Sequence, residues 1–208
     1  ALADLRLDHP ALVPEAGRLT LKIEREERTE PRVRVCCEGT ACLTWKIVDA
    51  TGPNAPGLAP ELVPVFEVSP TGLNASALGE ELGRPAPVSR GWAHAPRWDL
   101  VIGEHTLATE PWRRRAADMV ELGLWHAALA WAHLLGVSHL VRRVARMRLD
   151  VVPEGGGALR VVAQVRPRSG GRALADAWLY LPDGRCVGVV EGIEGVAVGA
   201  PALDVRRG

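Results

Sequence analysis

The residues best suited to acid–base chemistry lie in and just before one long apolar segment, residues 112–135 (WRRRAADMVELGLWHAALAWAHLL). Asp118, Glu121 and His126 interrupt this segment, and His105 precedes it. Carboxylates and imidazoles transfer protons most effectively when burial and neighbouring groups bring their pKa values toward neutrality. Asp118, Glu121 and His105 are therefore the candidates for a general acid and a general base.

The element that would position these groups is a helix over residues 112–135. The segment has no Pro and one Gly, and its apolar residues occupy nearly every side of a helix. A helix that is apolar all round must be enclosed by other structure. At the helical period Asp118, Leu122 and Trp125 share one stripe, with Glu121 at its edge. Leu122 and Trp125 are therefore candidates for contact with a substrate.

Two histidines lie seven residues apart on one flank of this expected helix, His126 and His133. His126 either contacts a substrate or is a histidine whose hydrogen bonds are satisfied within the core. Asp118, near the start of the helix, either takes part in proton transfer or only stabilises the helix dipole.

Composition excludes several classes of protein. The chain has 25 Lys and Arg against 25 Asp and Glu, so no net charge favours nucleic acid or an anionic membrane. No apolar run approaches the roughly twenty residues of a membrane span. No signal peptide is recognisable, and we expect a cytoplasmic protein. The four cysteines lack the paired spacing of a metal site, so we expect buried reduced thiols and no metal.

Short strands flank the helix on both sides. Residues 1–50 predict an antiparallel meander, residues 51–64 a linker rich in Pro and Gly, and residues 70–85 a short helix. One or two strands are expected in residues 88–108. Four more follow the helix, joined by glycine-rich or Pro-Asp-Gly turns; they occupy residues 139–153, 158–167, 172–181 and 186–198. This order predicts an α+β hot-dog fold, an antiparallel sheet wrapped round a long buried helix.

Four segments resemble the dehydratase domains of modular polyketide synthases, which are double hot dogs. ASALGEELGRPAPVSRGW (75–92) is similar to their short helix and the segment after it, and ADAWLYLPDGRCVGVVEGIEGV (175–196) to their closing hairpin. LADLRLDHPALVPEAGRLTLKIE (2–24) and ACLTWKIVDATG (41–52) resemble strands of their first hot dog. The resemblance implies a partial first hot dog and linker over residues 1–64. It implies a second hot dog over residues 65–208, around the helix 112–135.

The resemblance also implies a reaction. These domains dehydrate β-hydroxyacyl thioesters carried on the phosphopantetheine of an acyl carrier protein, so no other cofactor is expected. The expected partners are that carrier protein, neighbouring synthase domains and a second copy in a homodimer. The helix motif of the family, Asp-x-x-x-Gln or Asp-x-x-x-His, aligns with Asp118 to Leu122, which keeps the Asp and departs at its last position. Asp118 would be the acid.

The sequence departs most from the family in the motif that supplies the catalytic base. No histidine satisfies the family's His-x-x-x-Gly-x-x-x-x-Pro motif, so this base is absent or belongs to another segment of polypeptide. His105 and Glu121 offer another pair, similar in order to the His and Glu of bacterial single-hot-dog dehydratases.

Three functions follow as hypotheses. The first is a dehydratase, or a derived isomerase or cyclase. The second is a non-catalytic dehydratase-like domain kept for docking or dimerisation. The third is a hot-dog thioesterase, because ADMVELG (117–123) also resembles the helix start where such enzymes carry a water-activating acid.

Overall fold

The computed structural model describes residues 2–7, 19–24, 32–37, 40–47, 89–95, 100–106, 112–150, 152–153, 157–167 and 172–198. The elements in these ranges are β1 (Leu2–Leu7), β2 (Leu19–Glu24), β3 (Arg32–Cys37), β4 (Thr40–Ile47), β5 (Ser89–Ala95), β6 (Leu100–Thr106), α2 (Trp112–Leu135), β7 (His139–Leu149), β8 (Ala158–Pro167), β9 (Arg172–Tyr180) and β10 (Cys186–Ala197). The expected linker, the short helix at 70–85 and the domain boundary at residue 64 lie outside the described residues.

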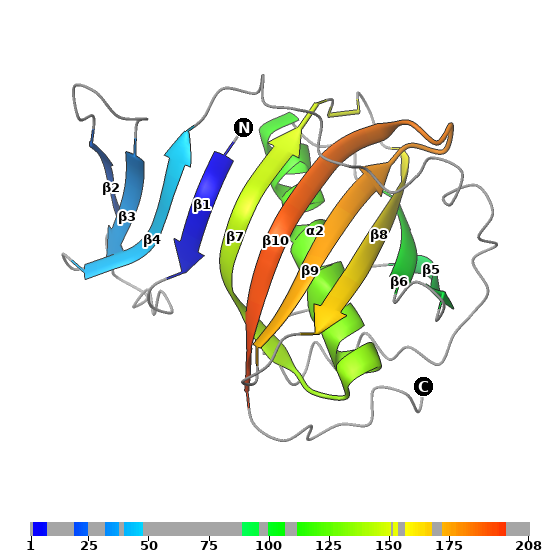
Figure 1. Ribbon diagram of the computed structural model, residues 1–208. Coiled ribbons are helices and arrows are strands. Elements are labelled where there is room, and N and C mark those ends of the chain that lie inside the picture. Colours follow the sequence, from blue (N-terminus) through cyan, green and yellow to red (C-terminus); the bar gives the residue numbers. More distant parts are fainter. Residues whose placement is uncertain are drawn as a thin grey trace.

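The strands form one ten-stranded antiparallel sheet in the order β2-β3-β4-β1-β7-β10-β9-β8-β6-β5 (Figure 1). The predicted meander is correct for β2, β3 and β4 but wrong for β1, which does not lie beside β2. Instead β1 pairs with β4 on one side and with β7 on the other, where Leu5 lies opposite Val144. The first strand of the chain thus joins the N-terminal strands to the strands around the helix.

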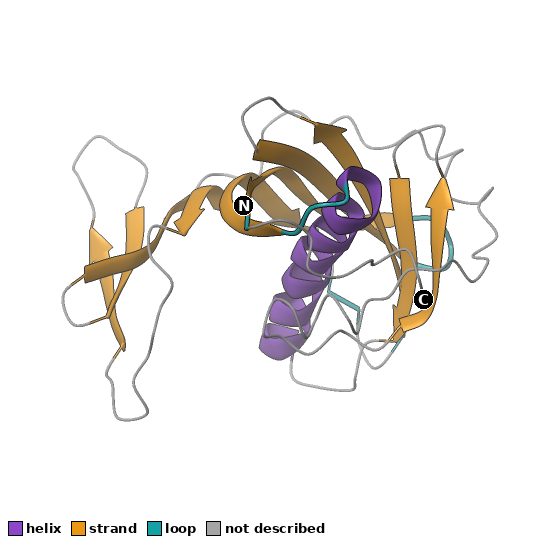
Figure 2. Cartoon of the chain, turned by 90° about the horizontal axis from the view of Figure 1, so that it is seen from below, coloured by secondary structure: helices purple, strands orange, loops and turns teal. Residues whose placement is uncertain are grey.

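The helix α2 packs against one face of this sheet, and the N-terminal strands extend away from it (Figure 2). Gly123 marks the side of the helix that approaches the sheet: a Cβ there would lie 3.2 Å from Val190 Cγ2 and 3.6 Å from Ala177 Cβ. On β9 the residues facing the helix include the small side chains of Ala173, Ala175 and Ala177. Small residues on both sides let the helix and the sheet pack closely.

Burial along α2 confirms that it is enclosed. Every residue from 125 to 132 is buried, and Met119, Leu129 and Trp131 have no exposed surface. The helix ends at Leu135, as predicted, because Gly136 adopts a positive φ of 68°. Its N–H donates to the carbonyl of Ala132 at 3.1 Å, which satisfies a carbonyl of the last turn.

The closing hairpin joins β9 and β10 through the predicted Pro182-Asp183-Gly184 turn. Gly184 has a φ of 84°, and its N–H donates to the carbonyl of Leu181 at 2.9 Å. The Asp183 carboxylate accepts a hydrogen bond from the N–H of Arg185, also at 2.9 Å. The turn residues that the sequence displays therefore fix the register of the two strands that they join.

The structure describes the side chains of two cysteines, Cys36 and Cys186. Cys36 and Cys186 are free, and both are half-buried rather than fully buried as expected. Burial raises the pKa of the Cys186 thiol, so it is a poor nucleophile. Over the same ranges no helix has the length and apolarity needed to span a membrane.

Candidate functional site

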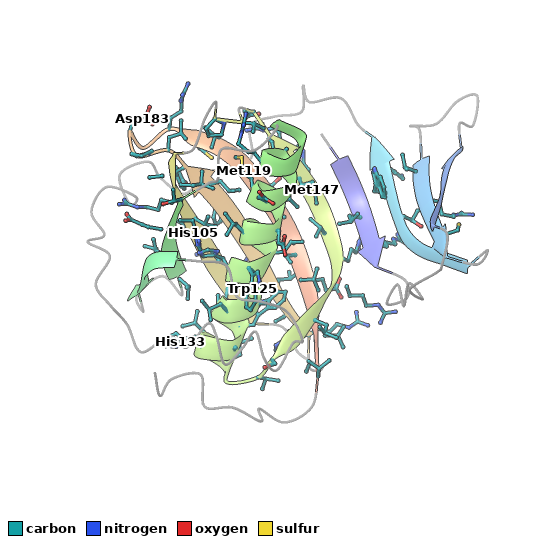
Figure 3. All side chains as sticks on the ribbon, turned by 180° about the vertical axis from the view of Figure 1, so that it is seen from behind. His105, Met119, Trp125, His133, Met147 and Asp183 are labelled. Carbon is teal, nitrogen blue, oxygen red and sulfur yellow. The ribbon has the colours of Figure 1, made fainter. Side chains whose placement is uncertain are left out.

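Two buried histidines meet between the sheet and the helix. Along β6 successive side chains alternate, so Val101 and His105 face α2 while Glu104 faces the other way and pairs with Arg160. His105 Nε2 lies 3.3 Å from His126 Nε2, and the two rings meet edge to face with centroids 4.9 Å apart. Figure 3 shows His105 on the β6 side of the helix. The sequence singled out both residues, and the structure brings them together.

The hydrogen bonds of His126 fix its tautomer. Its Nδ1 lies 2.7 Å from the carbonyl oxygen of Leu122, which accepts only, so Nδ1 carries the proton. Neutral His126 then has its lone pair on Nε2, and the proton between the rings belongs to His105 Nε2. Complete burial holds the pKa of His126 well below its ordinary value. The neighbouring His105 adds to that effect, and the Leu122 carbonyl opposes it.

Asp118 lies in the second turn of the helix, where the predicted start at residue 112 also places it. The helix begins at Trp112 and has no acidic residue in its first turn. The dipole stabilises carboxylates only within that first turn, so it gives Asp118 no structural role. The side chain is half-buried and makes no hydrogen bond or ion pair to another described residue. A half-buried carboxylate without a partner is available to a ligand.

Within one chain, His105 and Glu121 do not contact each other. His105 is 1% exposed and contacts His126, whereas the Glu121 side chain is exposed on the helix. Leu122 and Trp125, expected to contact a substrate, are both buried. The groups that lie near one another on α2 are therefore Asp118, Leu122 and Trp125, with the two imidazoles on the adjoining flank.

Asp176 is a buried polar residue whose role the sequence did not reveal. It is 6% exposed on the face of β9 turned away from α2. Its Oδ1 accepts a hydrogen bond from the N–H of Gly192 at 2.7 Å, and its Oδ2 pairs with Arg166. Gly192 lies at an irregularity of the β9–β10 register and has a φ of 58°. In the sequence, the signal for this role is an Asp in the middle of an apolar strand. In the structure, Asp176 holds the bulge.

Within the described part of the chain, no group of three or more His, Cys, Asp or Glu side chains is arranged to hold a metal ion. A further buried histidine, His139, donates its Nδ1 hydrogen to the carbonyl of Val137 at 2.8 Å.

Sequence comparison identifies no relative: no protein-family model matches the chain, and no curated protein matches it. Structure comparison identifies proteins of similar fold. A pyran synthase domain from module nine of the sorangicin pathway has a TM-score of 0.73 at 15% identity, over 95% of this chain and 78% of that one. The dehydratase domain from the CurF module of curacin polyketide synthase has a TM-score of 0.71 at 12% identity, over 95% and 76%.

A third similar structure is the dehydratase domain of PpsC from Mycobacterium tuberculosis in complex with C12:1-CoA. Its TM-score is 0.67 at 16% identity, over 95% of this chain and 74% of that one. At these identities the likeness establishes the fold. The chain has the hot-dog fold of polyketide synthase dehydratase domains, as the sequence predicted.

Proposed function

We propose that the chain is a dehydratase-like domain of a polyketide or related fatty-acid-type synthase, acting on a β-hydroxyacyl thioester. The observation that carries this proposal is the half-buried Asp118, which has no partner among the described residues, on the central helix of a dehydratase fold. Similar folds host unrelated activities, so the site and not the fold alone must support the function. Asp118 holds the position that the family motif gives to its acid.

The reaction removes water across two carbons. A base takes the α-proton, the electron pair forms the α,β double bond, and the C–O bond at the β-carbon breaks. A carboxylic acid at position 118 gives its proton to the departing hydroxyl, which leaves as water. Leu122 and Trp125, buried on the same stripe, hold the acyl chain and keep water from the reacting carbons.

His105 is the candidate base on this chain, and His126 would be its positioning residue. With its Nε2 proton directed at His126, neutral His105 has its basic lone pair on Nδ1. One imidazole that fixes the tautomer of another resembles the paired base and orienting group of many acid–base sites. Glu121 is a weaker candidate because its carboxylate is exposed.

A non-catalytic dehydratase-like domain is the second candidate. It is favoured by the burial of His105, which is 1% exposed and contacts His126. In that case the two histidines serve to attach α2 to β6, and the domain retains the fold for docking.

The partners follow from the substrate. We propose that an acyl carrier protein presents the thioester on its phosphopantetheine, that neighbouring synthase domains flank this one, and that two copies form a homodimer. C12:1-CoA bound to the similar PpsC domain supports a thioester as the ligand class.

Mass spectrometry of a β-hydroxyacyl pantetheine thioester incubated with the chain tests the proposal. Loss of one water by the wild type, abolished in Asp118→Asn, supports the dehydratase. Loss of activity in His105→Ala but not in Glu121→Gln would identify the base. Release of the free acid would indicate a thioesterase. An unchanged thioester with folded protein, over several chain lengths, would favour the non-catalytic domain.

A further inference from the structure

Trp125 has a buried polar atom without a partner among the described residues. Its side chain is 4% exposed, and its indole Nε1 makes no hydrogen bond to any residue in the described ranges. The indole N–H is a donor only, and a buried one almost always finds an acceptor because its desolvation is otherwise uncompensated. An orphan donor on a helix that also carries Asp118 indicates an acceptor supplied by a ligand.

The direction of Trp125 follows from the packing of the helix. Gly123 faces the sheet, since a Cβ added there would lie 3.2 Å from Val190 Cγ2. At 100° per residue Trp125 lies about 200° further round, on the side of α2 turned away from the sheet. Seen from the helix side in Figure 3, Trp125 lies on the middle of α2. Trp125 is therefore not part of the interface between the helix and the sheet.

Asp118 lies on the same side, seven residues earlier. Seven residues are about two turns and a rise of roughly 10 Å, and long helical side chains lean toward the N-terminus, that is from Trp125 toward Asp118. Asp118 has no partner among the described residues, and Leu122 between them is apolar and buried. The stripe thus presents an acid, an apolar stretch and a hydrogen-bond donor in succession.

We propose that Trp125 Nε1–H donates a hydrogen bond to a second oxygen of the acyl chain, farther from the thioester than the β-hydroxyl. This inference rests on the proposed function and names its substrate class: β-hydroxyacyl thioesters with a further hydroxyl, ether or keto oxygen along the chain. The β-hydroxyl lies at Asp118, the intervening carbons lie on Leu122, and the second oxygen reaches the indole. Trp125 is then a specificity-determining residue.

Among the described residues two other buried indoles also lack an acceptor, and neither shares this setting. Trp131 packs on the His139 ring, with centroids 5.4 Å apart, and blocks the space beside Gly195. Trp178 is 5% exposed on β9, paired in register with Val162 and Val189 on the face opposite α2. Trp178 is therefore a matched control. Its indole is similarly buried and also lacks a described acceptor, but it lies on the face of the sheet opposite α2.

The test measures binding and turnover of pantetheine thioesters of one chain length. The reference carries only the β-hydroxyl, and three others add a hydroxyl at the δ, ζ or θ carbon. Wild type, Trp125→Phe and Trp178→Phe are compared, each with its urea unfolding midpoint. Phe keeps an aromatic ring and removes the donor, so the fold is retained while the hydrogen bond is lost.

We expect one of the oxygenated thioesters to bind wild type about tenfold more tightly than the reference. Trp125→Phe should abolish this preference, so that all four thioesters bind it with similar affinity, and Trp178→Phe should keep the preference. Equal affinities of wild type for all four thioesters, or a preference that survives Trp125→Phe, would overturn the inference while leaving the proposed function intact. Failure of folded wild type to bind any thioester would overturn both.

Discussion

The imidazole of His105 on β6 lies edge to face against that of His126 on α2, with their Nε2 atoms 3.3 Å apart and both rings buried. The carbonyl of Leu122 fixes the proton of His126 on Nδ1, so the pair is ordered as donor His105 and acceptor His126. Protonating both rings would place two like charges side by side in the core. The pair is therefore stable only while at least one ring is neutral.

Stability should fall in mild acid because of His126. Its pKa in the folded chain is lowered well below the ordinary value of 6.5 by burial. Below pH 6.5 the imidazole at position 126 is protonated in the unfolded chain but stays neutral in the folded chain. Above that pH it is neutral in both states. The free energy of unfolding should thus decrease by up to about 1.4 kcal/mol per pH unit as the pH falls below about 6. His126→Gln should show a flatter dependence in urea titrations between neutral and acidic pH. The same dependence of unfolding free energy on pH in both proteins would show that His126 is not the cause.

A methyl group at Gly195 should destabilise the fold. An added Cβ would lie 2.6 Å from Trp131 Cζ3 and 2.9 Å from His139 Cβ, both of which belong to buried side chains. Gly195→Ala should cost about 1–3 kcal/mol of unfolding free energy, measured by urea denaturation. Gly157→Ala is the control, because nothing lies within 4 Å of a Cβ there. Equal stability of both variants would show that Trp131 does not pack against Gly195.

Removing the Asp176 carboxylate should loosen the β10 bulge. Asp176→Ala leaves the Gly192 N–H without its 2.7 Å acceptor and Arg166 without its partner. The expected loss is about 2–3 kcal/mol, with faster hydrogen exchange at the Gly192 amide. Glu194→Ala, which breaks the 3.2 Å pair with the largely exposed Arg172, should cost no more than about 1 kcal/mol. Unchanged hydrogen exchange at the Gly192 amide in Asp176→Ala would show that Asp176 does not hold the bulge.

The sequence predicted the elements that depend on local pattern. The helix from Trp112 to Leu135 has the bounds that its apolar period and Gly136 indicate, and the strands from β7 to β10 lie between the predicted turns. Each of these features is encoded by neighbours a few residues apart. The hot-dog order of strand, helix and antiparallel strands followed from them.

What the sequence did not predict depends on contacts between distant segments. β1 pairs with β7 across more than a hundred residues, and no local pattern specifies that partner. His105 and His126 are 21 residues apart, and only the packing of α2 on β6 shows that they meet.

The comparison of wild type with Asp118→Asn tests the central claim most directly. Asn has nearly the same shape, and Asp118 has no partner among the described residues to lose, so the urea midpoint should not change. The rate of water loss from a β-hydroxyacyl thioester should fall at least about a hundredfold, because the amide cannot protonate the leaving hydroxyl. Wild-type dehydration that persists at full rate in Asp118→Asn would contradict the assignment of Asp118 as the acid.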